Sequence, residues 1–231
     1  MGAIGMLTNS AMAEPRPGNR QPPDRLGLLH SVQAALAIDG HDPSTSTTLR
    51  STTVLDCRQN LLPVRDEAEI FLRCYLEHVY FLPCLARDDV ESLLACFAAA
   101  KDFQLLSEDG DALHTLRLFD TYMQIAIGIM VSPEFIRLSN HSVALQAAAV
   151  RLLPAVLRSR RHIDTVHCLI LLVAFAMFNP NGGSVWHLLG LALRMCITAG
   201  LHKEAGSQGA LTSQEADDGR WLFWSVYCLD R

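Results

Sequence analysis

The chain has 231 residues, of which 50% are apolar and 19% charged, against about 45–50% and about 25% in average globular proteins. This length suffices for one well-filled core, and the composition excludes a chain that is disordered throughout. The 24 acidic and 19 basic side chains give a formal net charge of −5. Because DNA binding depends on clustered Lys and Arg, we expect any nucleic-acid role to be indirect or to lie outside this chain.

Residues 1–65 differ in composition from the rest, and we expect a disordered tail or linker there. Prolines, glycines and a Ser/Thr-rich stretch from Ser44 to Thr53 leave too few apolar residues for a packed core. Within this segment, Leu26 to Ile38 has helical apolar spacing and is followed by Asp39-Gly40. It predicts one amphipathic helix that docks on the main body or on a partner.

Residues 66–231 are expected to form one all-α domain, an irregular multi-helix body. Apolar residues recur at intervals of three and four, and the breaks fall on Pro, Gly and Asn. Successive helices are predicted from Asp66 to Pro83, from about 89 to 103, 111 to 131, 141 to 157, 164 to 178, 185 to 199, and from about 213 onward.

Several residues signal helix ends. Ser132-Pro133 predicts an N-cap with Pro in the first helical position, and Ser184 predicts a second N-cap. Gly200 is expected at the C′ position, with Leu201 folding back onto the helix that it ends. Thr212 to Glu215 has the sequence of a capping box for the last helix.

The cysteines and the longest apolar run indicate packing rather than chemistry. Seven cysteines are widely spaced without a C-x-x-C pair, which argues against a zinc ribbon and favours the reduced thiols of a cytosolic or nuclear protein. The apolar run from Cys168 to Phe178 falls short of the roughly 18–20 residues of a membrane span. It predicts a buried core helix.

No constellation typical of an enzyme or metal site is found. His162 and His167 are five residues apart, a spacing that does not place two zinc ligands on one helix face. A nucleophile pair of Cys168 with His167 stays open, but neighbours in sequence point to different faces, and apolar surroundings raise a thiol pKa. We therefore favour an inert, buried thiol.

Two clusters have a simpler explanation than binding. Three basic residues are interpreted as a solvated connection between helices rather than a DNA site: Arg158, Arg160 and Arg161. Four aromatic residues have the spacing of a helix that buries one side, and they predict core packing: Trp221, Phe223, Trp224 and Tyr227.

Two C-terminal segments carry a more specific pattern, VWHLLGLALRMCITAGLHKE from Val185 and LTSQEADDGRWLFWSVYCLDR from Leu211. Together they resemble the middle homology region, the fungal-specific transcription factor domain of regulators that carry a six-cysteine binuclear zinc cluster. The resemblance covers roughly residues 70–231. The matching residues of the first segment are Trp186, Gly190, Arg194, Met195, Gly200, Leu201, His202 and Lys203. Those of the second are Thr212, Glu215, Arg220, Phe223, Trp224, Tyr227, Asp230 and Arg231.

The resemblance implies the regulatory, ligand-sensing or autoinhibitory part of a nuclear, non-enzymatic transcription regulator, with metabolic or secondary-metabolite genes as targets. It implies no cofactor in this chain, because zinc is expected only in the family's N-terminal module. DNA contact would come through that module alone. The implied partners are other proteins or a second copy of the chain, without a membrane, and a small-molecule effector stays open.

The sequence departs from the family pattern in three places. The N-terminal tail holds only Cys57 where the family has six cysteines, and the family domain continues past Asp230-Arg231. Gly219 stands where a basic residue is common and weakens its helix by about 1 kcal/mol relative to Ala. We therefore expect a regulatory region cut at both ends, whether a fragment, a truncated product or an incomplete gene model.

The matched residues are interpreted as structural: Gly200 caps a helix, His202 lies near its negative end, and Asp230 pairs with Arg231. The alternative function is a helical interaction module, or a truncated competitor of a full-length regulator. An all-helical enzyme is disfavoured. Because the last helix carries apolar groups on more than one face, we also expect exposed apolar surface and self-association.

We predict that the isolated chain holds no stoichiometric zinc and binds no duplex DNA selectively, because it is net acidic and lacks paired cysteines. Metal analysis after a chelator wash and a DNA titration at physiological salt measure this. One tightly held zinc per chain, or sequence-selective nanomolar binding, would contradict the prediction.

Overall fold

The computed structural model shows an all-α protein, as predicted, with eight helices and no strand in the part of the chain that it describes. The expected boundary between a tail and a domain at residues 65 and 66 stays a prediction, because most of residues 1–64 lie outside that part. The described residues are 25–37, 63, 65–79, 90–102, 112–133, 135–158, 161–179, 181–203 and 213–231.

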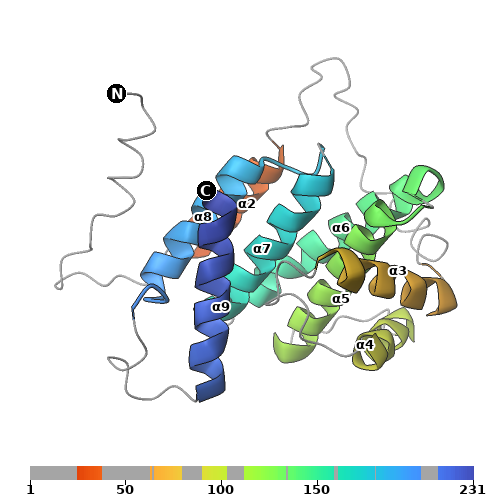
Figure 1. Cartoon of the computed structure of the whole chain (residues 1–231), viewed down its shortest axis with the longest axis horizontal. Coiled ribbons are helices and arrows are strands. Elements are labelled where there is room, and N and C mark those ends of the chain that lie inside the picture. The colour runs from red at the N-terminus through yellow and green to blue at the C-terminus, as the bar shows by residue number, and fades with distance from the viewer. Residues whose placement is uncertain are drawn as a thin grey trace.

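Helix α7 (His162–Phe178) lies at the centre of the helical body (Figure 1). Eleven of its residues between Thr165 and Ala176 are buried, which confirms the predicted core helix. No described helix is long and apolar enough to cross a bilayer. Four helices pack around α7: α5 (Ala112–Val131), α6 (Phe135–Arg158), α8 (Val185–Thr198) and α9 (Ser213–Asp230).

Helix α5 connects the helices around α7 with the two helices that precede it in the chain. It packs against α6 as well as α7, and it carries α3 (Arg65–His78) and α4 (Val90–Asp102) on its far side (Figure 1). The backbones of α3 and α5 meet at Gly128, where a Cβ atom would overlap the carbonyl oxygen of Phe71. The absence of a side chain at Gly128 therefore sets how closely these two helices approach.

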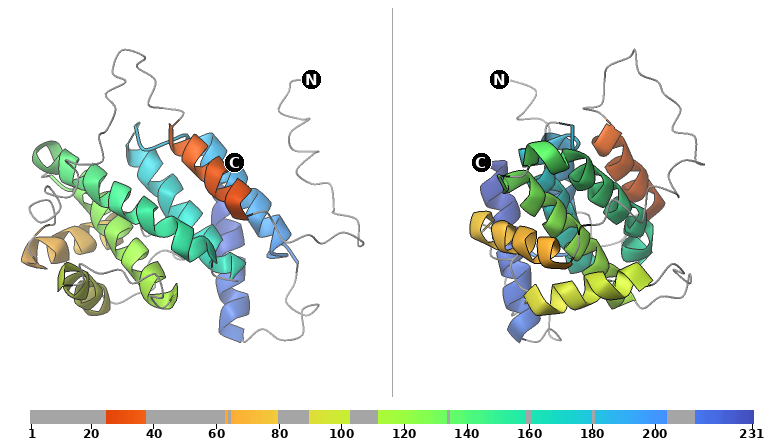
Figure 2. Two further views of the ribbon diagram at one scale, coloured as in Figure 1. Left: turned by 180° about the vertical axis from the view of Figure 1, so that it is seen from behind. Right: turned by 90° about the vertical axis from the view of Figure 1, so that its right-hand side faces the viewer.

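Helix α2 (Arg25–Ala37) docks on the helical body, so the predicted helix at residues 26–38 and its docking on the main body are confirmed. It packs against α8 and α6, on the side seen from behind in Figure 2. Its inward face buries Val32 and Ala35. The Ser184 backbone N–H also donates a hydrogen bond of 2.8 Å to the Ala35 carbonyl.

The predicted start of one helix was wrong. Helix α6 begins at Phe135, six residues before the expected His141, and runs without a break to Arg158. The polar pair Ser139-Asn140 lies within its second turn on a solvent-accessible side, so its polarity marks a surface and not an end. The Ser132 hydroxyl donates to the Ile129 carbonyl at 2.7 Å and so closes α5, the helix before it.

Gly128→Ala is expected to lower the free energy of unfolding by about 2 kcal/mol or more, because the clashing atom belongs to backbone that cannot rotate away. The matched control is Gly190→Ala on α8, where nothing lies within 4 Å of the added atom. There we expect a gain of up to about 1 kcal/mol from helix propensity. Urea unfolding compares the two, and equal stabilities of the variants would refute the assigned α3–α5 contact.

Candidate functional site

The loop after α8 has the conformation that the sequence predicts. Gly200 has φ +73°, a left-handed conformation that favours glycine. Its N–H donates to the Ile197 carbonyl, and the Leu201 N–H donates to the Cys196 carbonyl, both at 3.0 Å. These two bonds form a Schellman motif, which satisfies carbonyl groups at the end of the helix.

Leu201 joins the end of α8 to α9. Its side chain is half-buried against the core, and its Cδ2 atom lies 3.1 Å from where a Cβ atom of residue 219 would stand. Any side chain at Gly219 would press on this methyl group. A side chain at position 219 would thus require the Leu201 methyl group to move by a few tenths of an ångström.

Three further motif residues lie along one exposed side of α8. Trp186, Gly190 and Arg194 follow each other at intervals of four residues, and Trp186 is 74% exposed. No described atom fills the space beside Gly190.

Ser184 stands at the N-cap of α8, as predicted, but its hydroxyl forms no hydrogen bond with the helix backbone. The hydroxyl oxygen lies 2.8 Å from Nδ1 of His187 instead.

Helix α9 has one buried and one exposed side. Leu222 and Val226 are buried against the body, whereas three rings point outward and form what we call the aromatic surface. Its members are Trp221, Trp224 and Tyr227, with Trp221 54% and Trp224 55% exposed. The predicted core role is therefore wrong for these rings, while the expectation of apolar groups on a second face of this helix is confirmed.

The aromatic surface is ordered by ring contacts. The centroids of Trp224 and Tyr227 lie 5.5 Å apart in an edge-to-face arrangement, and half-buried Phe223 contacts both rings. The Arg231 guanidinium lies 5.2 Å from the centre of the Tyr227 ring. This cation–π contact replaces the expected ion pair with Asp230, which the described residues do not form. Asp230 is exposed, as is His202 on the loop after α8.

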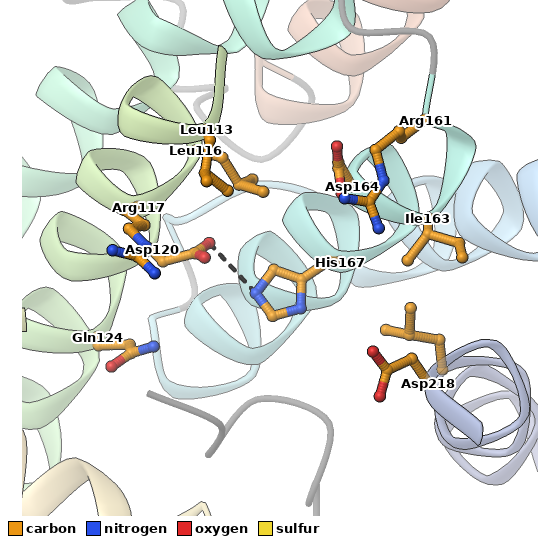
Figure 3. A pocket seen from close by; sticks show the side chains of 11 residues that line it. Leu113, Leu116, Arg117, Asp120, Gln124, Arg161, Ile163, Asp164, His167 and Asp218 are labelled. Carbon is orange, nitrogen blue, oxygen red and sulfur yellow. Dashed lines mark ion pairs between the residues drawn. The ribbon is translucent and has the colours of Figure 1, made fainter. Parts of the chain in front are cut away.

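A small polar cavity opens between α5, α7 and α9 (Figure 3). It has a volume of about 190 Å³, and its wall combines aliphatic side chains with charged and amide groups. Within it, His167 Nε2 of α7 lies 3.2 Å from Asp120 Oδ1 of α5. The sequence analysis missed this site, although Asp120 and Gln124 within an otherwise apolar stretch of α5 were a usable signal. The lining is Leu113, Leu116, Arg117, Asp120, Gln124, Arg161, Ile163, Asp164, His167, Asp218 and Leu222.

The environment of Cys168 bears on the nucleophile pair left open by the sequence. Cys168 is fully buried, and burial, with a smaller contribution from Asp120, raises its pKa well above the ordinary range. His167 lines the cavity instead, so the two neighbours lie on different faces of α7. Cys196 is also buried, which raises its pKa to about 12. Within the described ranges no three His, Cys, Asp or Glu residues gather as metal ligands.

Comparison with known families identifies the class of protein. The family described as "Fungal specific transcription factor domain" matches residues 90–231, which span the body from α4 to α9. The match covers more than half of the chain. The chain therefore belongs to this family, as its two C-terminal segments had suggested.

Three curated relatives are fungal regulators. "Protein STB5" of Saccharomyces cerevisiae is 30% identical over 70% of this chain and 22% of its own length. The "Negative regulator of pleiotropic drug resistance STB5" of Candida glabrata is 29% identical over 71% and 17%. The "Lactose regulatory protein LAC9" of Kluyveromyces lactis is 27% identical over 80% and 20%. This chain thus spans about a fifth of their length. No solved structure gives a significant match.

We expect iodoacetamide at about pH 8 to modify the exposed Cys228 of the native chain, leaving Cys168 and Cys196 unmodified until urea unfolds it. Their raised pKa values keep both buried thiols protonated, and the reagent has no access. Peptide mass mapping assigns each site, with Cys228→Ser as the control for reagent specificity. Rapid native labelling of Cys168 would restore the nucleophile hypothesis.

Proposed function

We propose that this chain is a regulatory domain of a fungal transcription regulator and controls transcription through contacts with other proteins. Family membership over residues 90–231 is the observation that carries the proposal. In this role the chain acts in the nucleus without catalysing a reaction. DNA recognition is assigned to residues outside this chain, because its net charge of −5 disfavours the grip of Lys and Arg on phosphates.

The aromatic surface is the contact site that we assign to a protein partner. Exposed Trp and Tyr supply large apolar areas at little entropic cost, and both are enriched among residues that dominate binding energy. The Trp224–Tyr227 and Phe223 contacts hold the rings in fixed positions before any partner arrives. Buried Leu222 and Val226 fix the opposite side of α9 in the core, so the rings are presented on a rigid support.

A reporter gene tests this function. The chain is fused to an unrelated DNA-binding domain in yeast and is expected to change reporter expression several-fold relative to that domain alone. The double variant Trp221→Ala/Trp224→Ala is expected to abolish the change, because truncating two such rings costs more than about 1 kcal/mol each. We expect the core packing of this double variant to stay intact, because both rings are more than half exposed.

The matched control is Met177→Ala, which truncates an exposed apolar side chain of α7 outside the aromatic surface. Reporter expression should stay at the parent level, with equal protein amounts verified by immunoblot. The regulatory role would be contradicted if the fusion of the unsubstituted chain left reporter expression at the level given by the DNA-binding domain alone. An effect seen only when the unfused chain is co-expressed with a full-length relative would favour the competitor instead.

A further inference from the structure

Two oxygen atoms in the cavity between α5, α7 and α9 have no hydrogen-bond partner. Asp120 Oδ1 and Gln124 Oε1 stand one turn apart on α5, and both accept no hydrogen bond within the described structure. The residues are only 5% and 3% exposed. An unsatisfied buried acceptor costs about 1–3 kcal/mol, and more when charged, so such atoms in a native fold call for a ligand or water.

His167 does not satisfy these acceptors. Its Nε2 atom lies 3.2 Å from Asp120 Oδ1, near enough for an ion pair when the ring is protonated. The contact nevertheless lacks the angular geometry of a hydrogen bond, so Oδ1 keeps a free acceptor position. Figure 3 shows the Asp120 carboxylate and the Gln124 amide reaching from the same helix toward the cavity.

The rest of the lining favours a positively charged ligand with an apolar part. Three carboxylates face the cavity against two guanidinium groups, and the side chain of one of these, Arg161, is 55% exposed and 3.9 Å from Asp164. The aliphatic wall is formed by Leu113, Leu116, Ile163 and Leu222. Charged N–H donors bind carboxylates about twice as strongly as neutral donors do.

The volume limits the size of this ligand. An apolar cavity of about 150 Å³ holds benzene, so about 190 Å³ accommodates roughly six to nine non-hydrogen atoms. A metal ion fits the site less well, because the described His, Cys, Asp and Glu residues do not converge in a set of three.

We propose that this cavity binds a small organic cation, an amine or amidine whose N–H groups donate to Asp120 and Gln124 while its apolar part contacts Leu116, Ile163 and Leu222. The site does not depend on the transcriptional role, because binding is a property of the purified chain. Since Leu222 faces the cavity and its neighbour Trp221 belongs to the aromatic surface, an occupant would rest directly on α9.

Calorimetric titration of the full chain tests the proposal, with benzamidine and benzylamine as cationic probes. We expect a Kd near about 1 mM, which is ordinary for a ligand of this size. Asp120→Asn should weaken binding by about tenfold or more, because the charge-assisted hydrogen bond is lost. Asp217→Asn, an equivalent change on the exposed side of α9, should leave it unchanged.

A second variant keeps the test decisive if Asp120→Asn unfolds. Gln124→Met removes an unsatisfied acceptor at similar volume, so it should preserve or raise the melting temperature of the free chain while weakening the cationic probes. Benzyl alcohol and benzoate, of matched shape but neutral and anionic, should bind more weakly than benzylamine. No cation binding up to about 10 mM, or equal binding of all four probes, would overturn the proposal.

Discussion

Burial of α7 on all sides is the constraint from which the rest of the architecture follows. A helix that is apolar around its whole circumference cannot rest on one neighbour, so α5, α6, α8 and α9 must enclose it. Each fully buried Leu, Ile, Val or Phe gains about 1.5–3 kcal/mol on leaving water, before chain entropy is counted. The polar side chains of α7 lie in its first turns, and two of them, Asp164 and His167, line the cavity.

The sequence predicted most of the fold because its signals were local. Helical spacing located α2, α4, α5, α7 and α8 to within a few residues, and a single glycine, Gly200, identified the end of α8. The prediction failed at the start of α6, which was expected at His141, whereas the helix begins at Phe135 and includes the polar pair Ser139-Asn140. Polarity alone does not distinguish a loop from the exposed side of a long helix, which only neighbouring helices define.

The aromatic surface and the cavity were harder to predict from the sequence, because both depend on which helices pack against each other. The spacing of Trp221, Trp224 and Tyr227 indicated an apolar helix side, but not that Leu222 and Val226 would take the buried place instead. The cavity combines residues of three helices that are up to about a hundred positions apart in the chain. Asp120 and Gln124 were visible as polar residues in an apolar stretch, yet their unpaired state follows only from the fold.

Leu201, which follows α8, lies against Gly219 of α9. This contact helps to fix the position of α9 relative to α8, whatever the length of the segment that joins the two helices. The segment between Lys203 and Ser213 begins just after a turn fixed by its own hydrogen bonds and ends at a helix held by its buried side. Lengthening a connection between two fixed ends costs only about 0.6 kcal/mol per doubling. A change in the number of residues between Lys203 and Ser213 is therefore expected to leave the packing of α8 against α9 in place.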